Sequence, residues 1–212
     1  MPVDAHIYPV ALVLRGRRCL VVGGGNVAAQ KVKGLLAAGA EVHVTARDVG
    51  AAMRELAGQR GLASVEERPY RSGEAAGYWL VVAATGDPTV NQSVYDDGEK
   101  SGVFVNSADD PERCSFMLPA VARQGPVTVA VSTGGYSPAL AGWLKEQFAQ
   151  QMGPELAELA ELLAEARARL KAEGRSTEGV DWRSGLSSAM LDLIRDGRRA
   201  EAKERLEACL SQ

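Results

Sequence analysis

Apolar and polar positions change their spacing several times along the first half of the chain. Short runs rich in β-branched and aromatic residues predict strands, at residues 17–22, 41–45, 63–67, 78–84 and 102–105. Segments with helical spacing lie between most of these runs, at residues 26–38, 49–60 and 88–100. Strand, helix and strand in repeated order predict a parallel sheet with right-handed crossovers.

The pattern differs after Pro111. Two β-rich runs, at residues 116–123 and 127–132, flank Gln124-Gly125-Pro126, which is typical of a hairpin. The remaining chain is rich in Ala, Leu, Glu, Arg and Lys and predicts helices, at residues 138–151, 154–172, 183–195 and 197–210. We therefore predict an α/β fold with a parallel sheet, followed by a small α+β region and a helical C-terminal domain.

Composition places the chain among ordinary globular proteins. Of its 212 residues, 46% are hydrophobic and 24% are charged, which argues against a disordered or fibrous protein. No apolar segment is long enough for a membrane span and the N-terminus lacks a signal-peptide pattern, so we expect a cytoplasmic protein. The formal net charge of −3 gives no overall attraction to nucleic acid or to an anionic membrane.

The cysteines and histidines do not suggest a metal centre. Cys19, Cys114 and Cys209 are far apart and odd in number, which predicts neither a disulfide framework nor a zinc site. His43 lies inside a β-branched run, where a structural role is the better interpretation. We expect reduced thiols, no resident metal and no histidine catalysis.

A glycine-rich turn follows the first predicted strand. Residues 23–28, Gly-Gly-Gly-Asn-Val-Ala, match the dinucleotide pattern G-x-G-x-x-G/A between an apolar strand and a helix. Gly23 permits the tight turn, Gly25 lets the backbone approach a diphosphate, and the helix start at Asn26 and Val27 offers free N–H groups. Such a turn can also be purely structural, but its place in the first strand–helix unit favours a Rossmann-type cofactor site.

Other cofactor contacts are expected where the second and fourth strands end. The usual acidic residue at the end of the second strand is absent; Asp48 comes slightly late but can serve, whereas Arg47 can meet a 2′-phosphate. The choice between NAD and NADP therefore stays open from chemistry alone. Thr85, after the fourth strand, is expected near the nicotinamide ribose.

Two adjacent aspartates, Asp109 and Asp110, follow the last strand predicted for the sheet. Ligands bind at the carboxyl edge of an open α/β sheet, which makes a functional role plausible for this pair. The other interpretation is a solvated Asp-Pro turn at Pro111. From position alone, the turn is the better interpretation.

Several motifs together resemble the precorrin-2 dehydrogenase family of siroheme synthesis, also found as the N-terminal part of siroheme synthases. They occur in order over about residues 6–150: Tyr8-Pro9-Val10, residues 19–28 with Lys31, Ala83-Ala84-Thr85, Val90-Asn91, residues 105–111, Ser115-Phe116, Pro119-Ala120, residues 129–135 and Ser137-Pro138.

The resemblance implies an NAD-dependent oxidoreductase that converts precorrin-2 into sirohydrochlorin in tetrapyrrole (porphyrin) biosynthesis, leading to siroheme or cobalamin. In some family members the same chain is also a ferrochelatase, so ferrous or cobaltous ion is a further candidate substrate. The resemblance also implies a homodimer and three domains: NAD-binding at residues 1–113, dimerisation at residues 114–150 and a helical domain at residues 151–212.

The family's acidic catalytic residue aligns with Asp109, which can act as general base while NAD accepts the hydride. Asp110 is then the turn residue. Because the substrate carries several carboxylates, basic and backbone groups are expected to line its cleft. The candidates are Arg15, Arg113 and Arg123 and the backbone of Thr133 and Gly134.

Each candidate substrate contact has a plainer interpretation, since the arginines can be ordinary surface residues and residues 133–135 can be a tight turn. For the chain as a whole, two alternatives stay open: another NAD(P)-dependent oxidoreductase on the same scaffold, or a nucleotide-sensing module without catalysis.

Overall fold

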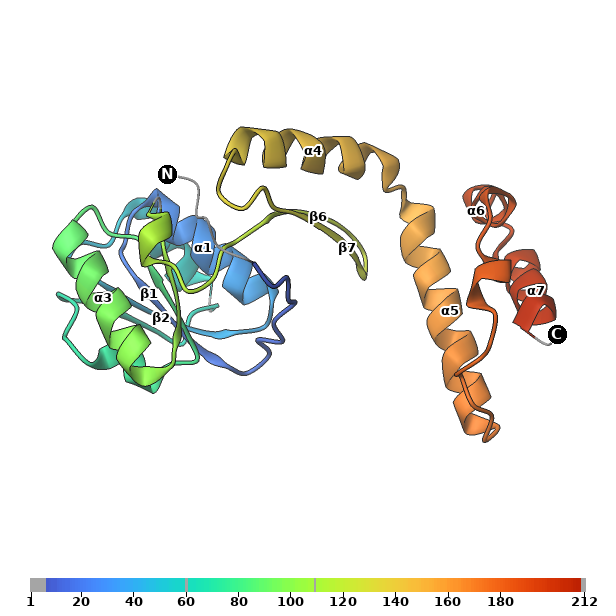
Figure 1. The fold of residues 1–212 in the computed structure, drawn as a ribbon, viewed down its shortest axis with the longest axis horizontal. Coiled ribbons are helices and arrows are strands. Elements are labelled where there is room, and N and C mark those ends of the chain that lie inside the picture. The colour runs from blue at the N-terminus through green and yellow to red at the C-terminus, as the bar shows by residue number, and fades with distance from the viewer. Residues whose placement is uncertain (1–6, 60, 109, 211–212) are drawn as a thin grey trace. The chain divides into compact units, whose positions relative to one another are not determined.

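The computed structural model describes residues 7–59, 61–108 and 110–210. The first half of the chain forms a parallel sheet, whose strands are β1 (Arg18–Val22), β2 (Glu41–Ala46), β3 (Ser64–Glu67), β4 (Leu80–Ala83) and β5 (Phe104–Ser107). Their order across the sheet is β3-β2-β1-β4-β5, and every neighbouring pair is parallel. Figure 1 draws this first half of the chain in blue to green. The predicted α/β, Rossmann-type fold is confirmed.

Helices cover both faces of this sheet. Alternate residues of β1 point to opposite sides: Val21 packs in a cluster with α1 (Asn26–Ala37) and α2 (Ala51–Gly58), and Val22 packs in a cluster with α3 (Pro88–Ser101). The strands are apolar on both faces because both faces are buried. The winding direction reverses between β1 and β4, and in an open α/β sheet the ligand crevice lies at the carboxyl ends of the two strands where this reversal occurs.

Several predicted elements begin later than expected, and two of these shifts have a clear local cause. Gly102 ends α3 in the left-handed conformation, with φ of 67°, so β5 begins at Phe104 and carries Asn106 and Ser107. The helix predicted from residue 183 begins at Ser188 instead. Asp181 caps a separate short turn over Trp182–Gly185, and Ser187 caps the helix that follows.

The second half of the chain forms a hairpin and helices. Strands β6 (Ala120–Gln124) and β7 (Val127–Val131) pair antiparallel, and α4 (Pro138–Gln151) packs on them. Helices α5 (Pro154–Ala172), α6 (Ser188–Arg195) and α7 (Arg199–Leu210) share an apolar core around Leu162, Met190 and Leu206. Of the helices described, none is long and apolar enough to cross a membrane.

The chain divides into two compact units. The first contains the residues up to Leu118 and also Gly134–Tyr136, and the second contains Pro119–Thr133 and the residues from Ser137. Gly125, at the hairpin turn with φ of 55°, belongs to the second unit, where an added Cβ would lie 2.6 Å from the Cβ of Ala157 in α5. The three-domain division at residues 113 and 150 stays a prediction.

Candidate cofactor site at the carboxyl ends of β1 and β4

Gly23 makes the turn out of β1. Its φ of 131° favours glycine, and an added Cβ would lie 2.3 Å from the carbonyl oxygen of Ala84, at the end of β4. Its own N–H donates to the carbonyl oxygen of Thr45 in β2 at 2.9 Å. Any side chain here would push the end of β4 away from the turn. Glycine at this position therefore allows the turn to pack directly on β4.

Gly24 is needed for a different reason. An added Cβ would lie 2.1 Å from the carbonyl oxygen of Asp48, and the Gly24 carbonyl oxygen accepts from the N–H of Gly50 at 2.9 Å. The motif leaves this position unspecified, and sequence reasoning assigned it no role. Its constraint comes from the loop after β2, which the local sequence does not reveal.

Gly25 is open to solvent, and an added Cβ there would meet no atom within 4 Å. It has no side chain with which to cap α1, and the first intrahelical bond runs from the N–H of Ala29 to its carbonyl oxygen at 3.0 Å. The N–H groups at the start of a helix have no intrahelical partner and carry the positive end of its dipole. This uncovered helix start, which includes Asn26 and Val27, fits a diphosphate group.

Arg47 and Asp48 follow β2 directly and are both exposed. They lie beside the glycine turn through the Asp48 backbone, which packs on Gly24. The loop places both charges at the edge of the sheet where the adenosine ribose of a dinucleotide binds in this fold.

Thr85 follows β4 and is bonded to the start of α3. Its Oγ1 lies 2.7 Å from Oδ1 of Asn91, and its carbonyl oxygen accepts from Nδ2 of Asn91 at 3.2 Å. Its Oγ1 also accepts from the N–H of Asp87 at 3.1 Å. The structure thus brings Thr85 together with Gly23, and it adds Asn91, whose only signal in the sequence was its place in a family motif.

The turn after β5 is tied to α3 by Arg113. Its Nε donates to Oε1 of Gln92 at 2.5 Å, and its Nη1 forms an ion pair with Asp110. Asp109, the predicted general base, lies outside the described residues. Of the described residues before it, Ser107 ends β5, the strand beside β4.

Cys114 fastens the same turn to β5. Its Sγ accepts from the N–H of Ser107 at 3.3 Å and lies 3.2 Å from the carbonyl oxygen of Asp110. Burial raises the pKa of the Cys114 thiol, so the group is neutral near pH 7. A neutral S–H can donate to one of the carbonyl oxygens of the turn, which a thiolate cannot do.

The remaining predicted residues belong to other parts of the two units. Arg15 is exposed and precedes β1, next to Gly39, so it lies at the opposite, amino edge of the sheet. Arg123 is exposed on β6 in the second unit. Thr133 accepts from the N–H of Ser137 at 3.0 Å, which is the tight turn into α4, and Gly134 has a φ of 60°. Their substrate-binding role stays a prediction.

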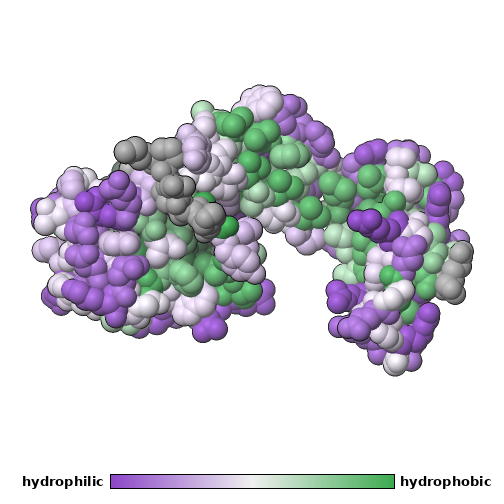
Figure 2. Space-filling model, viewed as in Figure 1, coloured by the Kyte–Doolittle hydropathy of each residue, from purple (hydrophilic) through white to green (hydrophobic). Residues whose placement is uncertain are grey.

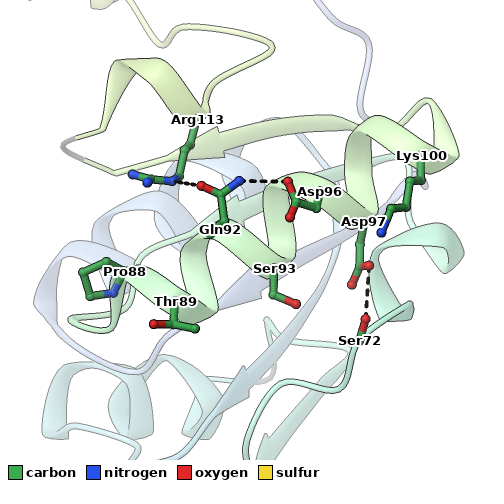
Figure 3. Close-up of a pocket in the computed structure, with 9 residues that line it drawn as sticks. All are labelled: Ser72, Pro88, Thr89, Gln92, Ser93, Asp96, Asp97, Lys100 and Arg113. Atoms are coloured by element: carbon green, nitrogen blue, oxygen red, sulfur yellow. Dashed lines mark hydrogen bonds between the residues drawn. The ribbon is translucent and has the colours of Figure 1, made fainter.

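A cavity of about 480 Å³ lies beside these loops, on the outer face of α3 (Figure 3). Its lining is polar and carries both charges, with Asp96, Asp97, Lys100 and Arg113 among the residues drawn. Asp97 is buried and accepts from Ser72, Tyr70 and the N–H of Gly73. Among the residues described, the lining includes none of the glycine turn, so this cavity is separate from the crevice.

Comparison with known proteins gives matches over nearly the whole chain. A family described as "Putative NAD(P)-binding" matches residues 10–120, and one described as "Sirohaem biosynthesis protein central" matches residues 124–151. The siroheme synthase of Nitrosococcus oceani is 37% identical over 204 residues, which are 95% of this chain and 43% of that protein. That of Methylococcus capsulatus is 37% identical over 198 residues, 92% of this chain and 41% of that protein.

The chain thus spans about two fifths of the length of these curated relatives. A solved structure described as "SirC, precorrin-2 dehydrogenase" is similar over 97% of this chain and 100% of that one, with a TM-score of 0.70 and 28% identity. The resemblance read from the motifs is confirmed. The glycine turn and the family match over residues 10–120 both indicate a nucleotide site. The chain belongs to this NAD(P)-binding family and takes a nicotinamide cofactor.

Proposed function

We propose that this chain oxidises precorrin-2 to sirohydrochlorin, with NAD as the hydride acceptor. The observation that carries the proposal is the similarity to the precorrin-2 dehydrogenase structure over 97% of this chain and 100% of that one. The siroheme synthases extend well beyond the region that this chain matches, so the proposal concerns the dehydrogenase step.

The residues at the crevice have distinct tasks in this reaction. The start of α1, from Gly25 to Val27, binds the diphosphate, and the loop at Thr85 borders the nicotinamide ribose. NAD, when bound, supplies the acceptor for the hydride. Asp109 removes the proton, so precorrin-2 and NAD⁺ give sirohydrochlorin, NADH and H⁺. Arg15, Arg123, Thr133 and Gly134 stay the proposed contacts to substrate carboxylates, whereas Arg113, which is bonded to Gln92 and Asp110, is proposed to position the turn after β5.

We propose NAD rather than NADP because of Asp48. Its exposed carboxylate, two residues after β2, can accept hydrogen bonds from the ribose hydroxyls and repels a 2′-phosphate. Arg47 favours the phosphate, so the two side chains oppose each other. Measuring kcat/KM with NAD and with NADP tests the assignment. Asp48→Ala should lower the preference for NAD. A parent enzyme that prefers NADP would contradict the assignment.

The test of the reaction is an anaerobic assay with enzymatically generated precorrin-2 and NAD. We expect NADH and sirohydrochlorin to form together, and Asp109→Asn to lower kcat by about 10²–10⁴, the usual contribution of a general base. Asp192→Asn, the same change at an exposed position of α6, is the control. No NAD-dependent turnover by the parent would reject the proposal, and an unchanged kcat in Asp109→Asn would reject the base.

Ferrous or cobaltous ion belongs in a second arm of this assay, because the family resemblance implies chelation in some members. A metal-dependent change in the sirohydrochlorin spectrum, above the control without enzyme, would assign that step to this chain. Among the described residues, no group of three or more His, Cys, Asp or Glu side chains is arranged to hold a metal ion.

We also propose a homodimer that pairs through the hairpin and α4. Leu140, Trp143 and Phe148 are 47%, 55% and 43% exposed on this helix, where Figure 2 shows a run of hydrophobic surface. Large exposed apolar patches are typical of protein interfaces. Light scattering should give twice the chain mass for the parent and the chain mass for Trp143→Glu. A monomeric parent at micromolar concentration would contradict the proposal.

A further inference from the structure

Asn91 holds the loop after β4 with a single side chain. It lies in the first turns of α3 and is 8% exposed, so its amide must find partners inside the protein. Besides its bonds to the hydroxyl and the carbonyl oxygen of Thr85, its Oδ1 lies 3.4 Å from the Thr85 N–H. One amide therefore meets both backbone polar groups of a loop residue and its hydroxyl.

Most of the hydrogen-bonding capacity of Thr85 is used within the protein. Its hydroxyl has one hydrogen, and the nearest acceptor is Oδ1 of Asn91 at 2.7 Å. The hydroxyl oxygen accepts from the N–H of Asp87, which also caps α3 through its side chain. Thr85 thus has little left to donate to a ligand, and what it contributes to the crevice is the path of its backbone.

On the side away from Asn91, the backbone of this loop packs closely against Gly23. The Ala84 carbonyl oxygen lies against Gly23, and the Thr85 nitrogen lies 3.4 Å from the position of a Cβ at Gly23. In this fold the adenosine half of the cofactor lies over β2, so the nicotinamide half lies over β4. The loop from Ala84 to Asp87 therefore borders the nicotinamide half, between the glycine turn and Asn91.

We propose that Asn91 is a positioning residue for the nicotinamide half of the cofactor. Its side chain fixes the loop at Thr85, and the loop shapes the site without a direct contact between Asn91 and the ligand. The inference rests on cofactor binding at the glycine turn, as in the proposed function. It does not require that precorrin-2 be the substrate.

The experiment measures cofactor binding alone. NADH affinity is measured by fluorescence, and ADP affinity by competition, for the parent, Asn91→Leu and Asn91→Asp. Asn91→Leu removes all the amide bonds at similar volume, and Asn91→Asp replaces the donor to the Thr85 carbonyl with a second acceptor oxygen. We expect NADH binding to weaken about tenfold in Asn91→Leu, while ADP, which lacks the nicotinamide half, changes less than about twofold.

Thr89→Ala is the matched control, because this exposed side chain lies on the same turn of α3 but lines the outer cavity (Figure 3). It should leave both affinities unchanged. Circular dichroism checks that each variant is folded, and if Asn91→Leu does not fold, Asn91→Asp decides. An equal loss of NADH and ADP affinity would overturn the proposal in favour of a general structural role, and so would unchanged NADH affinity in the folded variants.

The outcomes separate this inference from the proposed function. A parent that binds NADH but does not oxidise precorrin-2 would contradict only the proposed function, and the Asn91 comparison would still apply. A parent that binds no NADH would overturn both.

Discussion

The guanidinium Nε of Arg113 lies 2.5 Å from the side-chain oxygen of Gln92, and this contact joins the turn after β5 to α3. Asp110 completes the arrangement through its ion pair with the same arginine. Gln92 is the residue next to Asn91, so two consecutive amide side chains of one helix bind the loops that follow β4 and β5. Arg113, which the sequence predicted to bind substrate, is thus already bonded to two side chains of the protein.

Arg113→Ala should lower kcat more than it raises KM for precorrin-2. Losing the tie to Gln92 and Asp110 frees the turn that contains the proposed base, and a misplaced catalytic group typically costs tenfold or more in rate. We expect kcat to fall about tenfold and KM to change less than about threefold. Steady-state kinetics on the parent, Arg113→Ala and Lys100→Ala check this, with Lys100 as the exposed control cation on α3. A raised KM at unchanged kcat would instead make Arg113 a substrate contact.

The second and third glycines of the turn should respond differently to alanine. Gly24→Ala places a Cβ 2.1 Å from the Asp48 carbonyl oxygen, so we expect the free energy of unfolding to fall by about 1–3 kcal/mol. Gly25→Ala meets open space, so stability should stay near that of the parent. Its methyl group, however, occupies the approach of the diphosphate, and NADH binding should weaken about tenfold. Urea denaturation and NADH titration test both, and equal instability would contradict the distinction.

Asp97 should stabilise the fold in a pH-dependent way. Burial by itself raises the pKa of this carboxyl, but hydrogen bonds from the Gly73 N–H, Tyr70 and Ser72 outweigh it and hold the pKa below its ordinary value of 3.8. A carboxylate with a lowered pKa stabilises the folded state above the unfolded-state pKa. That contribution is lost as the pH falls from 3.8 through the lower folded-state value.

Asp97→Asn should therefore lower the free energy of unfolding by about 1–3 kcal/mol at pH 7, because one acceptor is replaced by a donor facing donors. The difference in free energy of unfolding between Asp97→Asn and the parent should become smaller as the pH falls below 4. The neighbouring exposed Asp96→Asn should change stability little. Denaturation curves at several pH values provide the measurement, and a difference that stays constant down to pH 2 would contradict the role of the charge.

Cys19 should be the least reactive thiol of the folded protein. It is fully buried in β1, and burial raises its pKa from 9.0 to about 11. In a variant with Cys114→Ser and Cys209→Ser, a thiol reagent at pH 8 should label the native protein at least about a hundredfold more slowly than the unfolded protein, since the thiolate is that much rarer. Rapid native labelling would mean that β1 opens. Because the folded-state pKa is raised, stability should also fall as the pH rises above 9.

Local patterns in the sequence were sufficient to predict the sheet and the glycine turn. The strands are β-branched runs that are buried on both faces, and the motif at Gly23 requires only a strand before it and a helix after it. Capping at Asp87 and Ser137 could also be read locally, because an N-cap acts on N–H groups two or three residues away.

Interactions between distant segments could not be read in this way. The constraint on Gly24 comes from a carbonyl on another loop, and the partners of Arg113 lie on a helix 21 residues earlier and in its own turn. Arg15 carries the right charge for a substrate carboxylate, but in a parallel sheet a residue before β1 lies at the edge away from the glycine turn. Charge alone does not indicate at which edge a residue lies.

The two units share one polypeptide in a way that limits how the protein can be divided. The backbone passes between them after Leu118, Thr133 and Tyr136, so no single cleavage yields two complete halves. A fragment that ends at Leu118 lacks Gly134–Tyr136, which belong to the first unit. A fragment that ends after α4 lacks α5, on which the hairpin turn at Gly125 packs. Grafting this chain onto another protein therefore means moving both units together, with fusion partners attached outside them.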